Sequence, residues 1–148
     1  VRTTVYRQTQ FAELEKIFHA EITEGRALTA DYKEKLWHRL NEKYYGSALT
    51  IDPLLDSEWS RIPHFYTPFY VYKYATGYSC ATAFAAGILS GDKEKLSKYL
   101  GFLQAGGSDY SLNILKKAGV DLTTPQPVQI TLDKFAEKLK ELKMLLNE

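Results

Sequence analysis

Apolar and aromatic side chains recur every three or four residues along most of this chain, and glycines follow several of these runs. The clearest run ends just before Gly46 and comprises Tyr32, Leu36, Leu40 and Tyr44. Because an α-helix has about 3.6 residues per turn, this spacing places the four side chains on one helix face. A glycine directly after such a run is a common helix end. No alternating segment is long enough to form a useful strand, so the sequence predicts an all-α fold.

The same criteria predict where the other helices lie. Thr29 is a suitable N-cap for the helix described above, Ser90 or Asp92 caps a later helix, and Thr131 caps the last one. Pro68 suits the first turn of a long helix. The other expected helices cover residues 4–24, 68–89, about 92–105, 110–118 and 132–146. Residues 47–63 are expected to form a loop with a helical turn near residues 56–60, and residues 120–130 to form an extended connector.

Composition narrows the class of protein. The 148 residues carry a formal net charge of +1, which gives no long-range attraction for nucleic acid. The single cysteine, Cys80, allows no internal disulfide or cysteine-based zinc site, and an unpaired thiol suits a reducing compartment. No apolar run reaches the roughly 18 residues of a membrane-spanning helix. We therefore expect a soluble cytoplasmic protein with neither a nucleic-acid nor a membrane partner.

The first residues of the sequence do not resemble a natural protein start. The chain begins at Val1 without an initiator methionine or a signal-like segment, and a helical pattern is under way by Val5. We therefore expect the sequence to be a fragment of a longer protein.

The segment from Pro63 to Tyr78 is unusually rich in aromatic side chains. It contains five tyrosines, two phenylalanines and His64, in a chain that is 14% aromatic overall. Helical geometry would place Tyr66, Tyr70 and Tyr74 on one side. These tyrosines are either core residues whose hydroxyls find buried partners, or a row of donors that faces a cleft. Because several phenols on one helix make a costly core, we favour the row of neutral donors, which can stabilise an oxyanion on a peptide carbonyl.

Three stretches of this segment form a recognisable pattern: Pro63-His64-Phe65-Tyr66, Phe69-Tyr70-Val71-Tyr72 and Tyr74-Ala75-Thr76-Gly77. Further stretches follow in the same order along the chain: residues 6–15, Tyr44-Tyr45-Gly46, Gly106-Gly107-Ser108, residues 115–121 and Pro125. Together they resemble the oligoendopeptidase F family, a branch of the thimet oligopeptidase-like zinc peptidases. The resemblance covers essentially the whole chain. It implies that the chain is the multi-helix C-terminal portion of a neurolysin/thimet oligopeptidase-like helical fold.

The resemblance also implies where the metal is held. Peptidases of this family bind zinc through the two histidines of a His-Glu-x-x-His helix and a glutamate on a following helix. This chain has only His19, His38 and His64, and no two of them are four residues apart. Residues 1–148 are therefore expected to form a single helical catalytic-domain fragment that lacks the upstream zinc helix and binds no metal. The pairs His38/Glu42 and Glu15/His19 are better interpreted as solvated contacts, because two ligands do not make a metal site.

Site residues follow from the same resemblance, position by position. His64 and Tyr70 match the family's histidine and its oxyanion-directed tyrosine, and Tyr74 is a secondary catalytic candidate. Tyr66 and Tyr72 are weaker, substrate-binding candidates. The loop Gly106-Gly107-Ser108 resembles a flexible segment beside the substrate channel, although a simple helix end explains it equally well.

The resulting hypothesis is a zinc metallo-oligoendopeptidase that hydrolyses short peptides, with this chain supplying transition-state donors and part of the channel wall. Its expected partners are short peptide substrates and the missing N-terminal, metal-bearing part of the same protein. The fragment alone is expected to be inactive. The alternative is a non-catalytic helical module of the same fold that only binds peptides or other partners.

Overall fold

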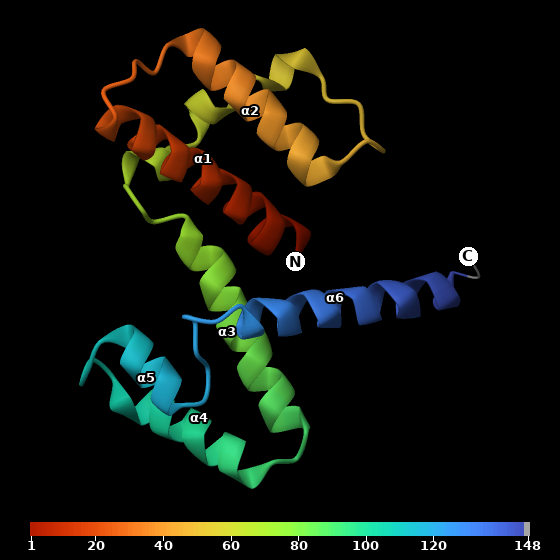
Figure 1. The fold of residues 1–148 in the computed structure, drawn as a ribbon. Coiled ribbons are helices and arrows are strands. Elements are labelled where there is room, and N and C mark those ends of the chain that lie inside the picture. The colour runs from red at the N-terminus through yellow and green to blue at the C-terminus, as the bar shows by residue number, and fades with distance from the viewer. Residues whose placement is uncertain (147–148) are drawn as a thin grey trace. The chain divides into compact units, whose positions relative to one another are not determined.

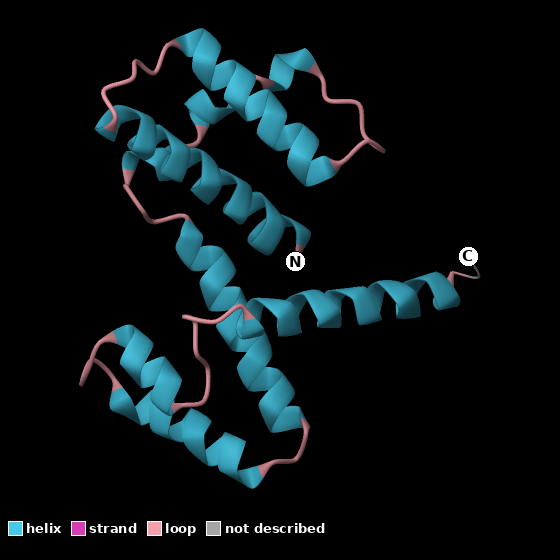
Figure 2. Cartoon of the chain, in the orientation of Figure 1, coloured by secondary structure: helices cyan, strands magenta, loops and turns pink. Residues whose placement is uncertain are grey.

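The computed structural model describes residues 1–146, and within them it contains helices and turns but no strand (Figures 1 and 2). The predicted all-α fold is therefore confirmed. The α-helices are α1 (Arg7–Thr23), α2 (Ala30–Tyr45), α3 (Tyr72–Leu89), α4 (Lys93–Ala105), α5 (Ser111–Lys117) and α6 (Gln126–Leu145). A π-helical turn, Arg2–Tyr6, precedes α1, and three 3₁₀ turns connect α2 to α3: Pro53–Leu55, Glu58–Arg61 and Pro63–Tyr66.

The chain divides into two compact units, an N-terminal unit (Arg2–Ala75) and a C-terminal unit from Thr76 onward. The expectation of one domain over residues 1–148 stays a prediction.

The predicted helix ends of α1, α2 and α4 are confirmed. Gly25 and Gly46 follow α1 and α2 with φ values of 76° and 71°, which glycine adopts without the steric cost of a side chain. Thr29 caps α2, since its Oγ1 accepts a hydrogen bond of 3.2 Å from the Tyr32 N–H. Asp92 rather than Ser90 caps α4, because its Oδ1 accepts from the N–H groups of Glu94 and Lys95.

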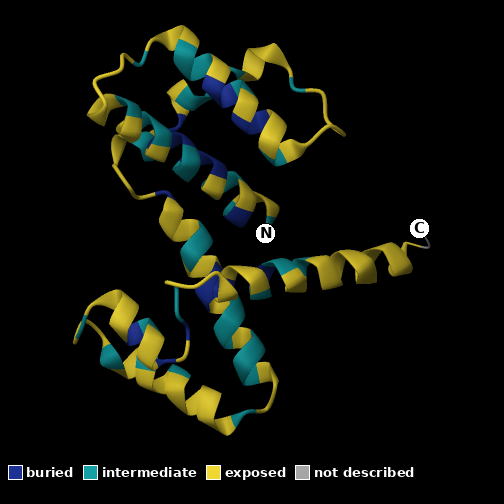
Figure 3. Cartoon of the chain, viewed as in Figure 1, coloured by how far each residue is buried: buried dark blue, intermediate teal, exposed yellow. Residues whose placement is uncertain are grey.

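The core of the N-terminal unit lies where α1 and α2 run side by side (Figures 1 and 3). Phe11 and Trp37 stack at its centre with ring centroids 5.5 Å apart. The buried members of the core are Phe11, Leu14, Leu36, Trp37, Leu40, Ile62 and Val71. Because Ile62 precedes the aromatic segment and Val71 lies within it, residues 63–70 are attached to the core at both ends.

Polar contacts attach the connection between α2 and α3 to the same core. The Arg7 guanidinium lies 4.5 Å above the Phe11 ring and forms an ion pair of 2.5 Å with Glu58. The Arg7 Nη1 also donates to the Gln10 Oε1 at 3.4 Å, and the Gln10 Nε2 donates to the Asn41 Oδ1 at 2.8 Å, which joins α1 to α2 through two buried amides. This irregular connection is therefore held by specific contacts.

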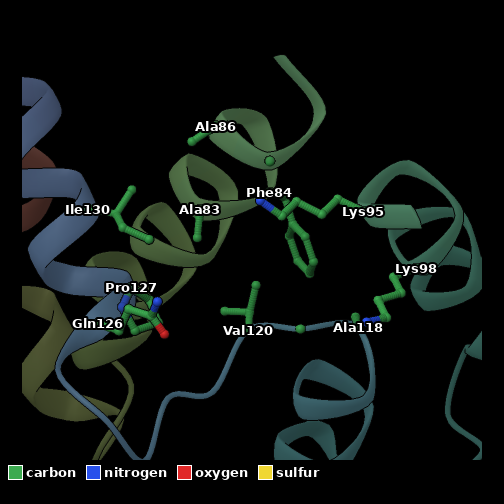
Figure 4. A pocket seen from close by; sticks show the side chains of 12 residues that line it. Ala83, Phe84, Ala86, Lys95, Lys98, Ala118, Val120, Gln126, Pro127 and Ile130 are labelled. Carbon is green, nitrogen blue, oxygen red and sulfur yellow. The ribbon is translucent and has the colours of Figure 1, made fainter. Parts of the chain in front are cut away.

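An aromatic cluster joins α3 to α4 in the C-terminal unit. Phe84 lies 5.1 Å from Tyr99 and 5.2 Å from Phe102, measured between ring centroids. Beside Phe84 is a pocket of about 380 Å³, which α3, α4, the segment after α5 and the start of α6 line (Figure 4). Lys98 lines this pocket, but its ammonium is paired with Glu94 at 2.6 Å. Cys80 is buried, as expected for a packing residue, and burial raises the pKa of its thiol.

The last helix begins earlier than the sequence suggests. The prediction of an extended connector over residues 120–130, followed by a Thr131 cap, is therefore wrong. Helix α6 begins at Gln126, and Pro127 occupies its first turn, where a missing N–H costs no hydrogen bond. Thr131 lies inside the helix, buried, and donates its hydroxyl to the Pro127 carbonyl at 3.1 Å. Lys134 pairs with Glu137 and Lys138 with Glu141, and such i,i+3 pairs stabilise the exposed face of this helix.

Among the described residues, no helix is both long and apolar enough to span a membrane.

The packing of α1 against α2 predicts that alanine substitution of two leucines in the N-terminal unit will change the free energy of unfolding by very different amounts. Leu14 is fully buried, whereas Leu54 is 85% exposed. Leu14→Ala should lower the free energy of unfolding by about 2–5 kcal/mol, because it opens a cavity in the core. Leu54→Ala should change it by no more than about 0.5 kcal/mol. Urea denaturation of both variants measures the difference, and equal effects would contradict the described core.

Candidate functional site

The aromatic segment forms a short, irregular path between two buried anchors. Ile62 is buried before it and Val71 within it, and the intervening residues form a 3₁₀ turn (Pro63–Tyr66) and a tight turn over residues 67–70. The tight turn is closed by the Tyr70 N–H, which donates to the Thr67 carbonyl at 3.2 Å. Helix α3 then begins at Tyr72. The predicted helix start at Pro68 is therefore wrong.

The backbone at Phe69 explains why the helix starts late. Phe69 has a φ of 56°, the only positive φ at a non-glycine position among the described residues, and this conformation cannot continue a right-handed helix. Its N–H donates to the Glu15 carboxylate at 2.7 Å instead of to a helical carbonyl. Tyr70 therefore lies outside the helix in which the sequence analysis placed it, and Tyr66 lies in the preceding 3₁₀ turn.

His64, Tyr70 and Tyr74 nevertheless come together in one group, which we call the His–Tyr cluster. The ring centroid of His64 lies 6.2 Å from that of Tyr70 and 5.5 Å from that of Tyr74. The two tyrosine rings are 5.6 Å apart, and the Tyr74 hydroxyl donates to the Tyr70 oxygen at 3.4 Å. The turn supplies Tyr70, the first turn of α3 supplies Tyr74, and the 3₁₀ turn supplies His64. Three residues predicted as catalytic candidates are thus neighbours in space.

The cluster combines exposed phenols with a half-buried imidazole. Tyr70 and Tyr74 are each 38% exposed. The Nδ1 of His64 is buried, and the described residues offer it no hydrogen-bond partner, while its ring stacks on that of Tyr70. The Lys73 Nζ lies 5.4 Å from the centre of the Tyr70 ring. The hydrogen bond to Tyr70 raises the pKa of Tyr74, because it stabilises the protonated phenol. The phenols are therefore accessible donors.

The weaker candidates lie at other places. Tyr66 is 82% exposed and lines a pocket of about 240 Å³ together with Trp59 and Phe65. Tyr72 is the first residue of α3 and is 47% exposed. The loop of Gly106, Gly107 and Ser108 belongs to the C-terminal unit, where it ends α4. Gly106 has a φ of 52°, as a helix end requires, so a structural role accounts for its glycine.

Within residues 1–146, no group of three or more histidine, cysteine or acidic side chains is arranged to hold a metal ion. The two pairs considered from the sequence have other contacts. His38 bonds Asp56 at 2.7 Å, which raises the pKa of the imidazole, and lies 3.6 Å from Glu42. Glu15 accepts from Phe69, and the His19 ring lies 4.5 Å from the Phe69 ring. The described residues therefore do not fit a zinc site.

Sequence reasoning missed Glu15 and Phe69 as residues near the cluster. The available signal was the place of Glu15 on α1, where it lies four residues after the buried Phe11 and next to the buried Leu14. A carboxylate on the apolar face of a helix is rare unless a donor satisfies it. Its partner, the Phe69 N–H, is 54 residues away and leaves no mark in the local pattern.

The chain is similar to known proteins over nearly all of its length. The sequence pattern of Peptidase family M3 matches residues 2–134. The chain is 48% identical over 145 residues to Oligopeptidase PepF of Bacillus subtilis, an alignment that covers 98% of this chain and 22% of that protein. It is 45% identical over 143 residues to Group B oligopeptidase PepB of Streptococcus agalactiae, covering 97% of this chain and 24% of that protein.

A solved structure gives the same result for the fold. The crystal structure of oligoendopeptidase-F from Enterococcus faecium superposes on this chain with a TM-score of 0.95 and 46% sequence identity. The superposition covers 99% of this chain and 28% of that chain.

This chain therefore belongs to peptidase family M3. Its predicted resemblance to oligoendopeptidase F is confirmed by relatives and a solved structure of that name. The chain spans about a quarter of the length of the curated relatives that it matches, 22% and 24% for the two described above.

The hydrogen bond within the cluster predicts a measurable titration difference. The pKa of Tyr74 should lie above that of an ordinary tyrosine and should fall toward the ordinary value in Tyr70→Phe, because that variant removes the accepting oxygen. A pH titration of tyrosine ring carbons by NMR measures both values. An unchanged pKa of Tyr74 in Tyr70→Phe would show that the two phenols do not interact.

Proposed function

We propose that this chain is part of a zinc metallo-oligoendopeptidase that hydrolyses peptide bonds in short peptides. Membership of peptidase family M3 supports the reaction class, and relatives named oligopeptidase or oligoendopeptidase support the substrate class. The proposed role of this chain rests on the His–Tyr cluster. In this cluster the hydroxyl oxygens of two accessible phenols lie 3.4 Å apart beside an imidazole.

The cluster is suited to stabilising negative charge without carrying charge itself. When water attacks a peptide carbonyl, the carbonyl oxygen becomes an oxyanion and needs donors that are already oriented. Neutral phenols are such donors, and because the Tyr74 hydroxyl donates to the Tyr70 oxygen, the proton of Tyr70 is left to donate to an acceptor. Tyr70 is the principal donor in this proposal. Tyr74 orients Tyr70 by donating a hydrogen bond to its oxygen, and His64 supplies a further donor. Tyr66, Tyr72 and the Gly106–Ser108 loop are proposed to contact the peptide away from the reacting carbonyl.

Zinc enters the proposal only as a cofactor of the whole enzyme. No group of described residues fits it, so residues other than those described here would hold the ion. No step assigned to this chain uses the metal. The chain alone is therefore proposed to be inactive, with the metal-bearing part of the same protein as its partner. A cytoplasmic location remains part of the proposal, in agreement with the free thiol of Cys80.

The assignment predicts a split between the kinetic constants of the full-length enzyme. Tyr70→Phe should lower kcat by at least about tenfold, because losing one oxyanion donor costs about 2.7–4 kcal/mol in the transition state. KM should change little, since the donor acts mainly after substrate binds. Tyr45→Phe is the matched control, because Tyr45 is 39% exposed on α2, also in the N-terminal unit, and has no proposed role.

Steady-state kinetics on a fluorogenic peptide measure these constants. An unchanged kcat in Tyr70→Phe would remove Tyr70 from the proposed role. Peptide binding without hydrolysis in the full-length protein, insensitive to a zinc chelator, would favour the alternative of a non-catalytic binding module.

A further inference from the structure

The turn that carries Tyr70 is held by a carboxylate on another helix. Glu15 is only 6% exposed, and its Oε1 accepts a hydrogen bond of 2.7 Å from the Phe69 N–H. A buried carboxylate requires strong donors to offset the loss of water, and a backbone N–H that points at it is such a donor. The contact therefore fixes the direction of the Phe69 amide relative to α1.

A second contact from α1 holds the side chain of Phe69. The His19 ring lies 4.5 Å from the Phe69 ring, and His19 follows Glu15 by one helical turn. Glu15 and His19, one turn apart on α1, thus contact the amide and the ring of Phe69, respectively. This accounts for the positive φ of 56°, which a phenylalanine keeps only when its surroundings enforce it.

Tyr70 lies between this held residue and a buried one. Phe69 precedes it, and Val71, 1% exposed, follows it in the core. With both neighbours fixed, the Cα–Cβ direction of Tyr70 is fixed, and its phenol is directed to Tyr74 and His64. A shift of the turn would move the phenol away from both.

We infer that Glu15 is a positioning residue, which orients the Tyr70 phenol for catalysis by holding the Phe69 N–H. The catalytic consequence rests on the proposed function, but the structural one does not. An apolar side chain of similar size, such as methionine, would fill the same space without accepting the hydrogen bond, so packing alone does not explain a carboxylate here.

The test compares variants of the full-length enzyme. Glu15→Gln keeps an oxygen that accepts from Phe69, so kcat should stay within about twofold of the parent enzyme. Glu15→Met removes the acceptor, so kcat should fall about tenfold to a hundredfold while KM changes by less than about twofold. Glu13→Met is the matched control, because Glu13 lies on the same helix and binds Lys43 and Tyr44 of α2 rather than the turn. Its kcat should remain unchanged.

A double variant distinguishes positioning from general destabilisation. If Glu15 acts through Tyr70, Glu15→Met should cause no further loss of kcat in a Tyr70→Phe background. An additive loss, an unchanged kcat in Glu15→Met, or an equal loss in Glu15→Gln would overturn the inference. Should Glu15→Met fail to fold, Glu15→Asp replaces it, because the shorter side chain withdraws the acceptor while keeping the charge, and the same loss is expected.

Crystal structures of Glu15→Met and Glu15→Gln separate this inference from the proposed function. In Glu15→Met the Phe69 φ should change and the Tyr70 phenol should leave Tyr74, whereas Glu15→Gln should keep both. An unmoved Tyr70 in Glu15→Met would overturn the positioning role whatever the kinetics show. A Tyr70→Phe enzyme with full activity would instead remove Tyr70 from its proposed catalytic role, while a displaced Tyr70 in Glu15→Met would still support the structural inference.

Discussion

The aromatic segment of this chain depends on its attachment to the packed face between α1 and α2. Ile62 and Val71 belong to the same buried group as Leu14 and Trp37. They fix the two ends of a stretch that is otherwise too irregular to hold its own shape. Between these anchors, His64 and Tyr70 are held close enough to contact each other and Tyr74. The core of the unit therefore determines the geometry of the His–Tyr cluster.

A polar contact sets the orientation of the turn that carries Tyr70, which the apolar core alone does not set. The apolar anchors restrain the position of the turn, whereas the hydrogen bond between Glu15 and the Phe69 N–H fixes its orientation. A donor for an oxyanion must be aimed as well as near, since orientation contributes to catalysis together with distance. A buried carboxylate and a phenylalanine with a positive φ are each unfavourable alone. Here the Phe69 N–H supplies the donor that the buried Glu15 carboxylate needs, and the bond to Glu15 in turn holds Phe69 in its backbone conformation.

The sequence predicted local features well and long-range ones poorly. The caps at Thr29 and Asp92 and the glycine ends of α1 and α2 were predictable, because each depends on a few adjacent residues. The start of α3 was not, since a contact 54 residues away decides it. The start of α6 was misjudged because Pro127 was interpreted as part of a connector, although proline suits a first helical turn. The closeness of Tyr70 and Tyr74 was predicted, but from a helix that Tyr70 does not join.

The central claim is that the Tyr70 phenol, with Tyr74 beside it, faces the oxyanion of the reacting peptide. A crystal structure of the full-length enzyme with a phosphinic peptide, whose phosphinate oxygens mimic that oxyanion, tests it most directly. The account predicts a phosphinate oxygen about 2.7–3.1 Å from the Tyr70 hydroxyl, with Tyr74 and His64 still beside it. A phosphinate bound with no oxygen within hydrogen-bonding distance of the cluster would contradict it.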